Sequence, residues 1–294
     1  MSSFYTPPGR VSGLSVLILP AAAAASVVLA PLYAAASLFV PFIYANIALI
    51  VFYGAAAGLA GGLAARATVT LNPPLAGFLA LLGGLVGFAL SWVAWLSMLF
   101  SLGTKFPGFP ELWGLVVDTE GWKAALSNPE ALIESAKIVN SEGIWSIGRS
   151  ASSSAVHGLP LLGVWIVEFL IFVVCCYLCS AKEAKAPYSF EAKAFLRREP
   201  KLPNGVAAPL DLDQLSQVTS GLASGDVSYF SSAPVVNNGE SGFFATLRSH
   251  GGSPWGTCDV NYVHQKGKKM ETVKVAEGIV LQLSTIAALR GRLS

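Results

Sequence analysis

Glu168 is the residue of this sequence most able to do chemistry, because it lies inside the apolar run GVWIVEFLIFVVCCYLC, Gly163 to Cys179. A carboxylate at the centre of a bilayer costs roughly 2.5 to 3.5 kcal/mol on insertion scales, and such residues usually face the interior of a helical bundle. Glu168 therefore needs a hydrogen-bonding partner inside the protein, or it carries a proton along a transport path. Its candidate partners are the polar residues of other apolar segments: Tyr53, Asn46 and Ser91.

A second group of candidate ligands lies near the C-terminus and comprises His250, Cys258, Asp259 and His264. Imidazole and thiolate bind zinc, but no Cys-x-x-Cys pair accompanies these residues, and Cys258 and His264 have even spacing on an expected strand. We therefore predict no metal site and no cofactor. Since nothing resembles a nucleophile with its base or a phosphate-binding loop, we also predict no catalytic residue and no enzyme.

Small residues in the apolar segments predict close helix packing. Gly54 with Gly58, and Gly83 with Gly87, have the four-residue spacing that lets helix backbones approach in lipid. We expect these glycines to join the second and third apolar helices, with homodimerisation and a permeation path as alternatives. For a further group at the end of the fourth helix we expect apolar packing, with S-acylation or thiol sensing as the alternative: Cys175, Cys176 and Cys179.

The composition indicates that membrane helices hold these residues. The chain has 294 residues, of which 53% are hydrophobic and 12% charged, against roughly 25% charged in soluble domains. Four runs reach the roughly 20 apolar residues that span a bilayer, at about 11–36, 40–64, 75–102 and 158–178. Pro41 is expected to begin the second helix. The first run is longer than the roughly 7 to 15 residues of a signal-peptide core, so we interpret it as a span.

The distribution of Lys and Arg predicts the orientation, since cytoplasmic flanks are enriched in them. The loop at about 103–157 carries four basic and six acidic residues, so we place it outside. The fourth helix is followed by the strongest basic cluster of the chain: Lys182, Lys185, Lys193, Arg197, Arg198 and Lys201. We therefore expect a multi-pass protein of a bacterial inner membrane, with both termini cytoplasmic.

The outside loop contains signals of order. Ser127 and Glu130 have capping-box spacing and predict a short helix. We expect three tryptophans of this loop, Trp113, Trp122 and Trp145, to anchor at the headgroup level, with a ligand-binding cap as the alternative.

The last third of the chain has the composition of a soluble domain. We predict a transmembrane domain over 1–180, a basic linker over 181–204 and a cytoplasmic α+β domain over 205–294. Asp211 is expected to cap a helix, and QLSTIAALRGRL to form a last one. Antiparallel strands are predicted in GFFATLRSH, CDVNYVHQ and METVKVAEG, with a hairpin turn at QKGKK. The fold class is four transmembrane helices plus a small α+β domain with an antiparallel sheet.

Three motifs of the membrane half, VPFIYAN, GIWSIG and WIVE, resemble those of a family of bacterial four-helix integral membrane proteins with a C-terminal cytoplasmic domain. The resemblance implies a similar architecture and no particular activity. Members of that family often carry cysteine pairs after the fourth helix, which suggests a small metal-binding fold, whereas this chain reads APYSFEAK there. This departure lowers the expectation of zinc further.

These observations favour a non-enzymatic membrane anchor, scaffold or sensor that presents a cytoplasmic interaction domain, as a subunit of a larger complex. The expected partners are membrane lipids, a protein bound through the cytoplasmic domain, and a second copy of the chain as a possible homo-oligomer. Nucleic acid is not expected, because thirteen basic residues after position 181 face ten acidic ones. The alternative is a small transporter, channel or proton-coupled component that uses Glu168.

Overall fold

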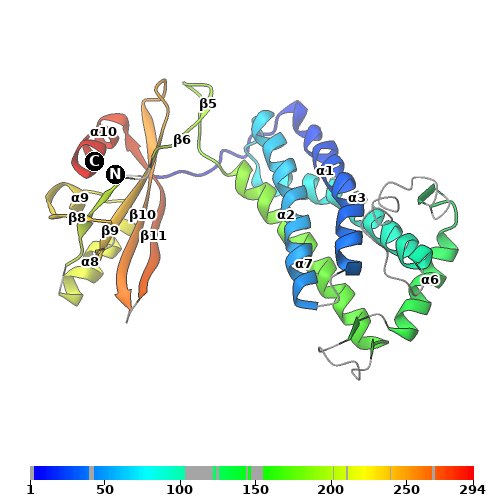
Figure 1. Ribbon diagram of the computed structural model, residues 1–294. Helices are drawn as coiled ribbons and strands as arrows, with labels where there is room; N and C mark the ends of the chain where they lie inside the picture. Colours follow the sequence, from blue (N-terminus) through cyan, green and yellow to red (C-terminus); the bar gives the residue numbers. More distant parts are fainter. Residues whose placement is uncertain are drawn as a thin grey trace. The chain divides into compact units, whose positions relative to one another are not determined.

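The computed structural model describes residues 3–39, 43–102, 122–123, 126–143, 145–146, 155–200, 202–209, 211–238, 240–266 and 269–294. The chain forms two compact units (Figure 1). One unit is Pro8–Lys185, and the other combines Met1–Pro7 with Ala186–Ser294.

Four long apolar helices dominate the first unit, as the hydropathy predicts, and each is long enough to cross a membrane. These helices are α1 (Ile18–Phe39), α2 (Ile43–Ala67), α3 (Pro73–Leu102) and α7 (Leu159–Ala184). The last helix continues to Ala184, beyond the expected end at residue 178, because Ser180 and Ala184 remain buried against the bundle. Pro41, the expected start of the second helix, lies outside the described residues.

Local capping explains where several helices begin. A 3-10 turn over Gly13–Leu17 precedes α1 and is capped by Ser12. The Asn72 side chain accepts from the amide of Leu75 at 3.1 Å, at the start of α3. The short helix predicted in the loop is confirmed as α6 (Pro129–Glu142), but its cap is Asn128, whose side chain accepts from the amide of Ala131. The predicted Ser127 cap is wrong, because the Ser127 hydroxyl donates to the Lys123 carbonyl instead.

The helices of the bundle approach each other through glycines. A Cβ added at Gly58 would lie 2.3 Å from the carbonyl oxygen of Cys176, and one added at Gly83 would lie 2.2 Å from that of Leu19. Gly54 faces Phe172 in the same way, and Gly87 faces Ser26. The first glycine pair therefore joins α2 to α7 and the second joins α3 to α1. The predicted contact between helices two and three through these glycines is wrong.

An antiparallel sheet with helices forms the second unit, which confirms the α+β expectation. Asp211 caps α8 as predicted, and its side chain accepts from the amides of Asp213 and Gln214. The strands lie in the order β1-β11-β10-β9-β7-β8, and β6 also pairs with β9. The elements are β1 (Ser3–Phe4), β6 (Arg197–Arg198), β7 (Asn204–Ala207), α8 (Leu212–Ala223), α9 (Tyr229–Ser232), β8 (Val235–Asn237), β9 (Gly242–Ser249), β10 (Trp255–Lys266), β11 (Lys269–Gln282) and α10 (Leu283–Leu293).

The N-terminal strand belongs to this second unit. Ser3 pairs with Val280, and Phe4 with Ile279, in antiparallel register. The amide of Tyr5 continues this pairing and donates to the carbonyl of Gly278 at 2.8 Å. Residues from the two ends of the chain therefore share one sheet, an arrangement that the sequence analysis did not anticipate.

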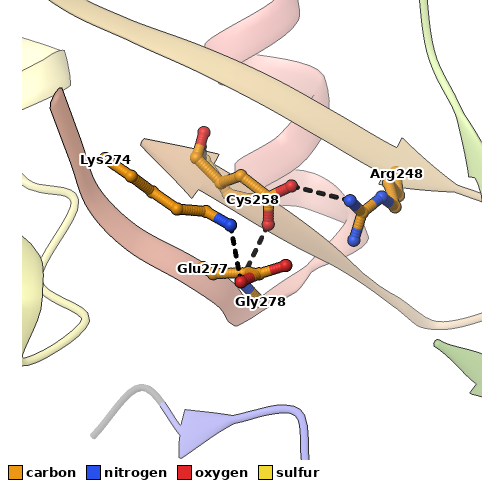
Figure 2. Close-up of polar contacts among 6 residues, drawn as sticks. Arg248, Cys258, Lys274, Glu277 and Gly278 are labelled. Atoms are coloured by element: carbon orange, nitrogen blue, oxygen red, sulfur yellow. Dashed lines mark hydrogen bonds and ion pairs between the residues drawn. The ribbon is translucent and has the colours of Figure 1, made fainter. Parts of the chain in front are cut away.

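A bulge in β11 lies where the N-terminal strand ends. Figure 2 shows polar contacts around this bulge, with Arg248 and Gly278 among the labelled residues. Gly278 has φ of 71°, which favours glycine, and its amide donates to the buried carboxylate of Asp259 at 2.8 Å. The other oxygen of Asp259 accepts from Arg248 at 2.8 Å. Asp259 thus fixes the backbone of the bulge at Gly278. The carbonyl of this same residue accepts the hydrogen bond from the amide of Tyr5.

The stretch 181–204 differs from the expected linker. Its first four residues complete α7, and from Ala186 onward it belongs to the second unit. Two short strands, β4 (Tyr188–Ser189) and β5 (Ala194–Phe195), pair within it. Leu196 and Leu202 are buried, and Gly205, the expected domain boundary, lies inside strand β7.

Candidate functional site

A small cavity of about 30 Å³ lies inside the helical bundle and contains the carboxylate singled out by the sequence. Three helices line it: α1, α3 and α7. The lining residues are Tyr33, Ser37, Phe88, Ser91, Trp92, Trp95, Trp165 and Glu168, and we call this set the aromatic cavity. A volume of this size holds about one water molecule.

Helical periodicity brings these side chains to one place. On α3, Ser91 and Trp92 each lie three or four residues from both Phe88 and Trp95, so the four residues share one face. On α7, Trp165 and Glu168 are three residues apart and share a face for the same reason. The sequence thus contained a signal for the aromatic residues that the analysis of polar partners did not use.

Glu168 is 92% buried, since only 8% of it is exposed. Within the described part of the chain, the structure gives its carboxylate no hydrogen bond and no ion pair. Basic side chains are also missing from the described lining of the cavity. Another acid of this helix, Glu183 near the end of α7, does have a basic partner, because it forms an ion pair with Arg66 at 2.9 Å.

Tyr33 of α1 lines the cavity together with Glu168. Tyr53, the predicted partner, is not among the residues that line the cavity. It stacks on Tyr33 with 5.1 Å between ring centroids, and its hydroxyl donates to the carbonyl of Ser26 at 2.9 Å. The Tyr53 hydroxyl therefore donates its hydrogen bond to the α1 backbone and not, as predicted, to Glu168.

The other two predicted partners of Glu168, Ser91 and Asn46, lie in different surroundings. Ser91 does line the cavity with Glu168, but its hydroxyl donates to the carbonyl of Phe88 at 2.7 Å. Asn46 is fully buried elsewhere in α2, and neither atom of its amide group has a partner among the described residues. Only Ser91 of the three is therefore brought to the same cavity as Glu168.

Besides Glu168, the two serine hydroxyls of the cavity are arranged as acceptors, whereas the Tyr33 hydroxyl can also donate. The hydroxyls of Ser37 and Ser91 donate to the backbone of their own helices, at 2.8 and 2.7 Å, so their lone pairs remain available. The carboxylate of Glu168 accepts hydrogen bonds when it is ionised. The site can thus receive a donor-rich or positively charged group.

Aromatic rings form the walls. The Trp92 ring stands at 86° to that of Trp165, with 4.9 Å between centroids, and at 67° to that of Trp95. Phe88 packs beside them against Phe169 and Phe172. The three tryptophans therefore line the cavity with rings in more than one orientation.

The cysteines of the fourth helix are free thiols. Cys176 is fully buried, lies against Gly58, and donates to the carbonyl of Ala80 at 3.4 Å. These contacts agree with a packing role for that residue. Of the tryptophans in the loop, Trp122 packs against the cluster around Trp95 and Val139. Trp113 and the side chain of Trp145 lie outside the described residues.

The candidate ligands of the C-terminal unit have other roles. His264 stacks on Tyr262, and the ring nitrogen of His250 accepts from the amide of Gly252 at 3.2 Å. Burial, reinforced by the charge of Asp259, raises the pKa of the Cys258 thiol to about 12, which disfavours the thiolate that binds metals. Among the residues that the structure describes, no three His, Cys, Asp or Glu side chains are grouped to hold a metal ion.

The chain matches no family model, no curated protein and no solved structure.

Proposed function

We propose that this protein is a non-enzymatic membrane anchor that presents a cytoplasmic interaction domain as a subunit of a larger complex. The pairing of β1 with β11 is the observation that carries the proposal. β1 precedes the first apolar helix and β11 follows the last. The chain therefore connects the folded domain to the bundle twice, once before the first helix and once after the fourth.

The same pairing supports a location of both termini on one side of the membrane. Four spans return the chain to the side on which it started, which agrees with a sheet built from both ends. The basic residues in the last turn of α7 and after it, among them Lys182, Lys185 and Lys193, favour the cytoplasm as that side. In a bacterium this corresponds to the inner membrane, with lipid headgroups near the basic residues.

A second candidate function is transport of a proton or a small cation, and Glu168 is the observation that favours it. Its carboxylate is buried in a cavity and lacks an ion pair within the described residues. Intramembrane acids of this kind mark ion and proton paths. Against this candidate, the described part of the bundle contains no second acid that lines the same cavity.

Crosslinking mass spectrometry on the full-length protein in its native membranes tests the anchor function. We expect a stoichiometric protein partner, or a second copy of the chain, with crosslinks that fall on exposed lysines of the second unit such as Lys269 and Lys274. A chain without such crosslinks that instead supports a proton flux in liposomes, lost in Glu168→Gln, would overturn the anchor function in favour of transport.

A further inference from the structure

We propose that the aromatic cavity binds a small ammonium cation, either a free amine or the ammonium group of a lipid headgroup. The proposal concerns the membrane bundle alone and does not depend on the anchor function. It rests on the chemistry of the lining: a buried acid, hydroxyl oxygens that can accept, and aromatic walls.

The acid supplies the first argument. A buried carboxylate is stabilised by a counter-charge or by donors, and removing one partner of a buried pair leaves the other at a large cost. The described lining offers Glu168 no basic partner, and its carboxylate has no hydrogen bond among the described residues, although Glu183 on the same helix has Arg66 at 2.9 Å. A cation held in the cavity would be the counter-charge of Glu168, as Arg66 is the counter-charge of Glu183.

The aromatic walls supply the second argument. Aromatic faces carry negative potential, and cages of Trp and Tyr attract ammonium groups most strongly when water is excluded. The Trp92 ring stands at 67° to that of Trp95 and at 86° to that of Trp165, with centroids 5.9 and 4.9 Å apart. All three rings line the same cavity as Glu168, so they offer aromatic surface to a cation held beside the acid.

The hydroxyl groups supply the third argument and narrow the ligand class. Ser37 and Ser91 use their protons on backbone carbonyls, so toward the cavity they can only accept. A ligand that carries N–H donors satisfies these oxygens and the carboxylate together. An ammonium group has such donors, whereas a carboxylate, a phosphate or an apolar ligand does not.

The size of the cavity restricts the ligand further. About 30 Å³ suits the ammonium group of methylammonium or the terminal ammonium of phosphatidylethanolamine. Glu168 lies nine residues beyond Leu159, at the start of α7, so it is roughly 14 Å from that end of the helix. A free amine would enter as a whole, and a lipid would have to bend its headgroup inward.

Calorimetric titration of the full-length protein in nanodiscs tests the proposal, with methylammonium as the probe and methanol as the neutral match of similar size. Sodium chloride keeps the ionic strength constant. Tryptophan fluorescence provides a second readout, because three of the seven tryptophans line the cavity. We expect saturable binding of methylammonium and none of methanol over the same concentration range.

Three variants locate the binding. Glu168→Gln should weaken methylammonium binding at least about tenfold, and Trp165→Leu about three- to tenfold. Glu183→Gln is the matched control on the same helix and should bind like the parent, because Glu183 does not line the cavity. Should Glu168→Gln fail to fold, as judged by gel filtration and thermal unfolding, Trp165→Leu still tests the site.

Lipid composition separates the two sources of the ammonium group. If the natural ligand is a free amine, methylammonium should bind equally in phosphatidylglycerol discs with and without phosphatidylethanolamine. If it is the headgroup, phosphatidylethanolamine should compete and weaken the apparent affinity about fivefold or more. Either result supports the proposal. Absence of saturable binding in phosphatidylglycerol discs, equal binding of methanol, or unchanged affinity in folded Glu168→Gln and Trp165→Leu would overturn it.

Discussion

The interior of the helical bundle and the interior of the C-terminal unit are built from different residues. Between the helices the fully buried positions are largely small, such as Ala22, Ala57 and Ala80, and backbones touch at glycines. In the C-terminal unit the fully buried positions include the large side chains of Phe230, Phe243 and Ile279. One chain thus uses two kinds of packing.

The surrounding solvent explains the difference. In water, burial of apolar area drives folding, so large side chains contribute most. In a bilayer, lipid tails are as apolar as leucine, and helices associate through close contact of their backbones and through interhelical hydrogen bonds. The glycines of α2 and α3 and the bond from Tyr53 to the Ser26 carbonyl belong to this second kind.

Truncation of one buried phenylalanine in each unit should give the largest contrast. Phe243→Ala should lower the free energy of unfolding of the C-terminal unit by about 3 to 5 kcal/mol. Phe172→Ala, at an equally buried position of the bundle, should cost about half as much, because the ring gains little by leaving lipid. Hydrogen exchange of the full-length protein measures both units separately, and equal losses would contradict the contrast.

The bundle, which should tolerate truncation of a large side chain better, should be sensitive to the addition of one methyl group at a glycine. Gly58→Ala would place its Cβ 2.3 Å from a backbone oxygen of α7, so we expect a loss of about 1 to 3 kcal/mol from overpacking. Gly163→Ala is the matched control, since nothing lies within 4 Å of its added Cβ. Thermal unfolding in detergent compares the two, and a loss of the same size in both variants would argue against close packing at Gly58.

Asp259→Asn should loosen the attachment of the N-terminal strand. The change removes the charge that Arg248 contacts and weakens the hold on the Gly278 amide, at a cost of about 1 to 3 kcal/mol. Hydrogen exchange should rise at Tyr5 and in β11. The control is Glu277→Gln, which alters an exposed contact with Lys274. Similar exchange in both variants would show that the carboxylate does not fix the bulge.

Acid should weaken the C-terminal unit by a small amount through Glu199. Burial raises the pKa of this carboxyl, but hydrogen bonds from Arg290 and Ser249 outweigh burial and lower it. A depressed pKa in the folded state means that the stabilisation is present above roughly pH 4.3, the ordinary value, and is lost as the pH falls further.

The Glu199→Gln variant should therefore show a flatter decline of stability below that pH, by about 1 kcal/mol or less. Denaturation curves of the parent and the variant at a series of pH values provide the measurement. An unchanged pH dependence would mean that the contact with Arg290 contributes nothing to stability.

Local signals in the sequence predicted the elements well. Uninterrupted hydropathy was sufficient for α1, α2, α3 and α7, because a spanning helix depends on length and composition alone. Asp211 marked the start of α8, because an N-cap acts on amides two and three residues away. The cap of α6 was misassigned by one residue, since Ser127 and Asn128 are both good caps.

Contacts between distant residues could not be predicted in the same way. Nothing local in Ser3 or Phe4 indicates that they pair with β11, at the far end of the chain. The surroundings of Glu168 depended on which helices are neighbours: the bundle places Tyr33 of α1 in the same cavity and turns the Tyr53 hydroxyl to the Ser26 carbonyl. The aromatic cavity likewise arises only when α3 and α7 bring their tryptophans together.

The shared sheet of the two chain ends is the central claim, and a cysteine crosslink tests it most directly. Ser3 and Val280 lie opposite each other in antiparallel register, so Ser3→Cys with Val280→Cys should form a disulfide under mild oxidation in membranes. The control pair, Ser3→Cys with Val273→Cys, lies seven residues out of register and should not form one. In the single variant Ser3→Cys, a membrane-impermeant maleimide should label the introduced cysteine only when the vesicles are inside-out. A crosslink in the first pair and not in the second, with labelling from the cytoplasmic face, is the predicted result. Absence of the crosslink, or labelling from the outer face, would contradict it.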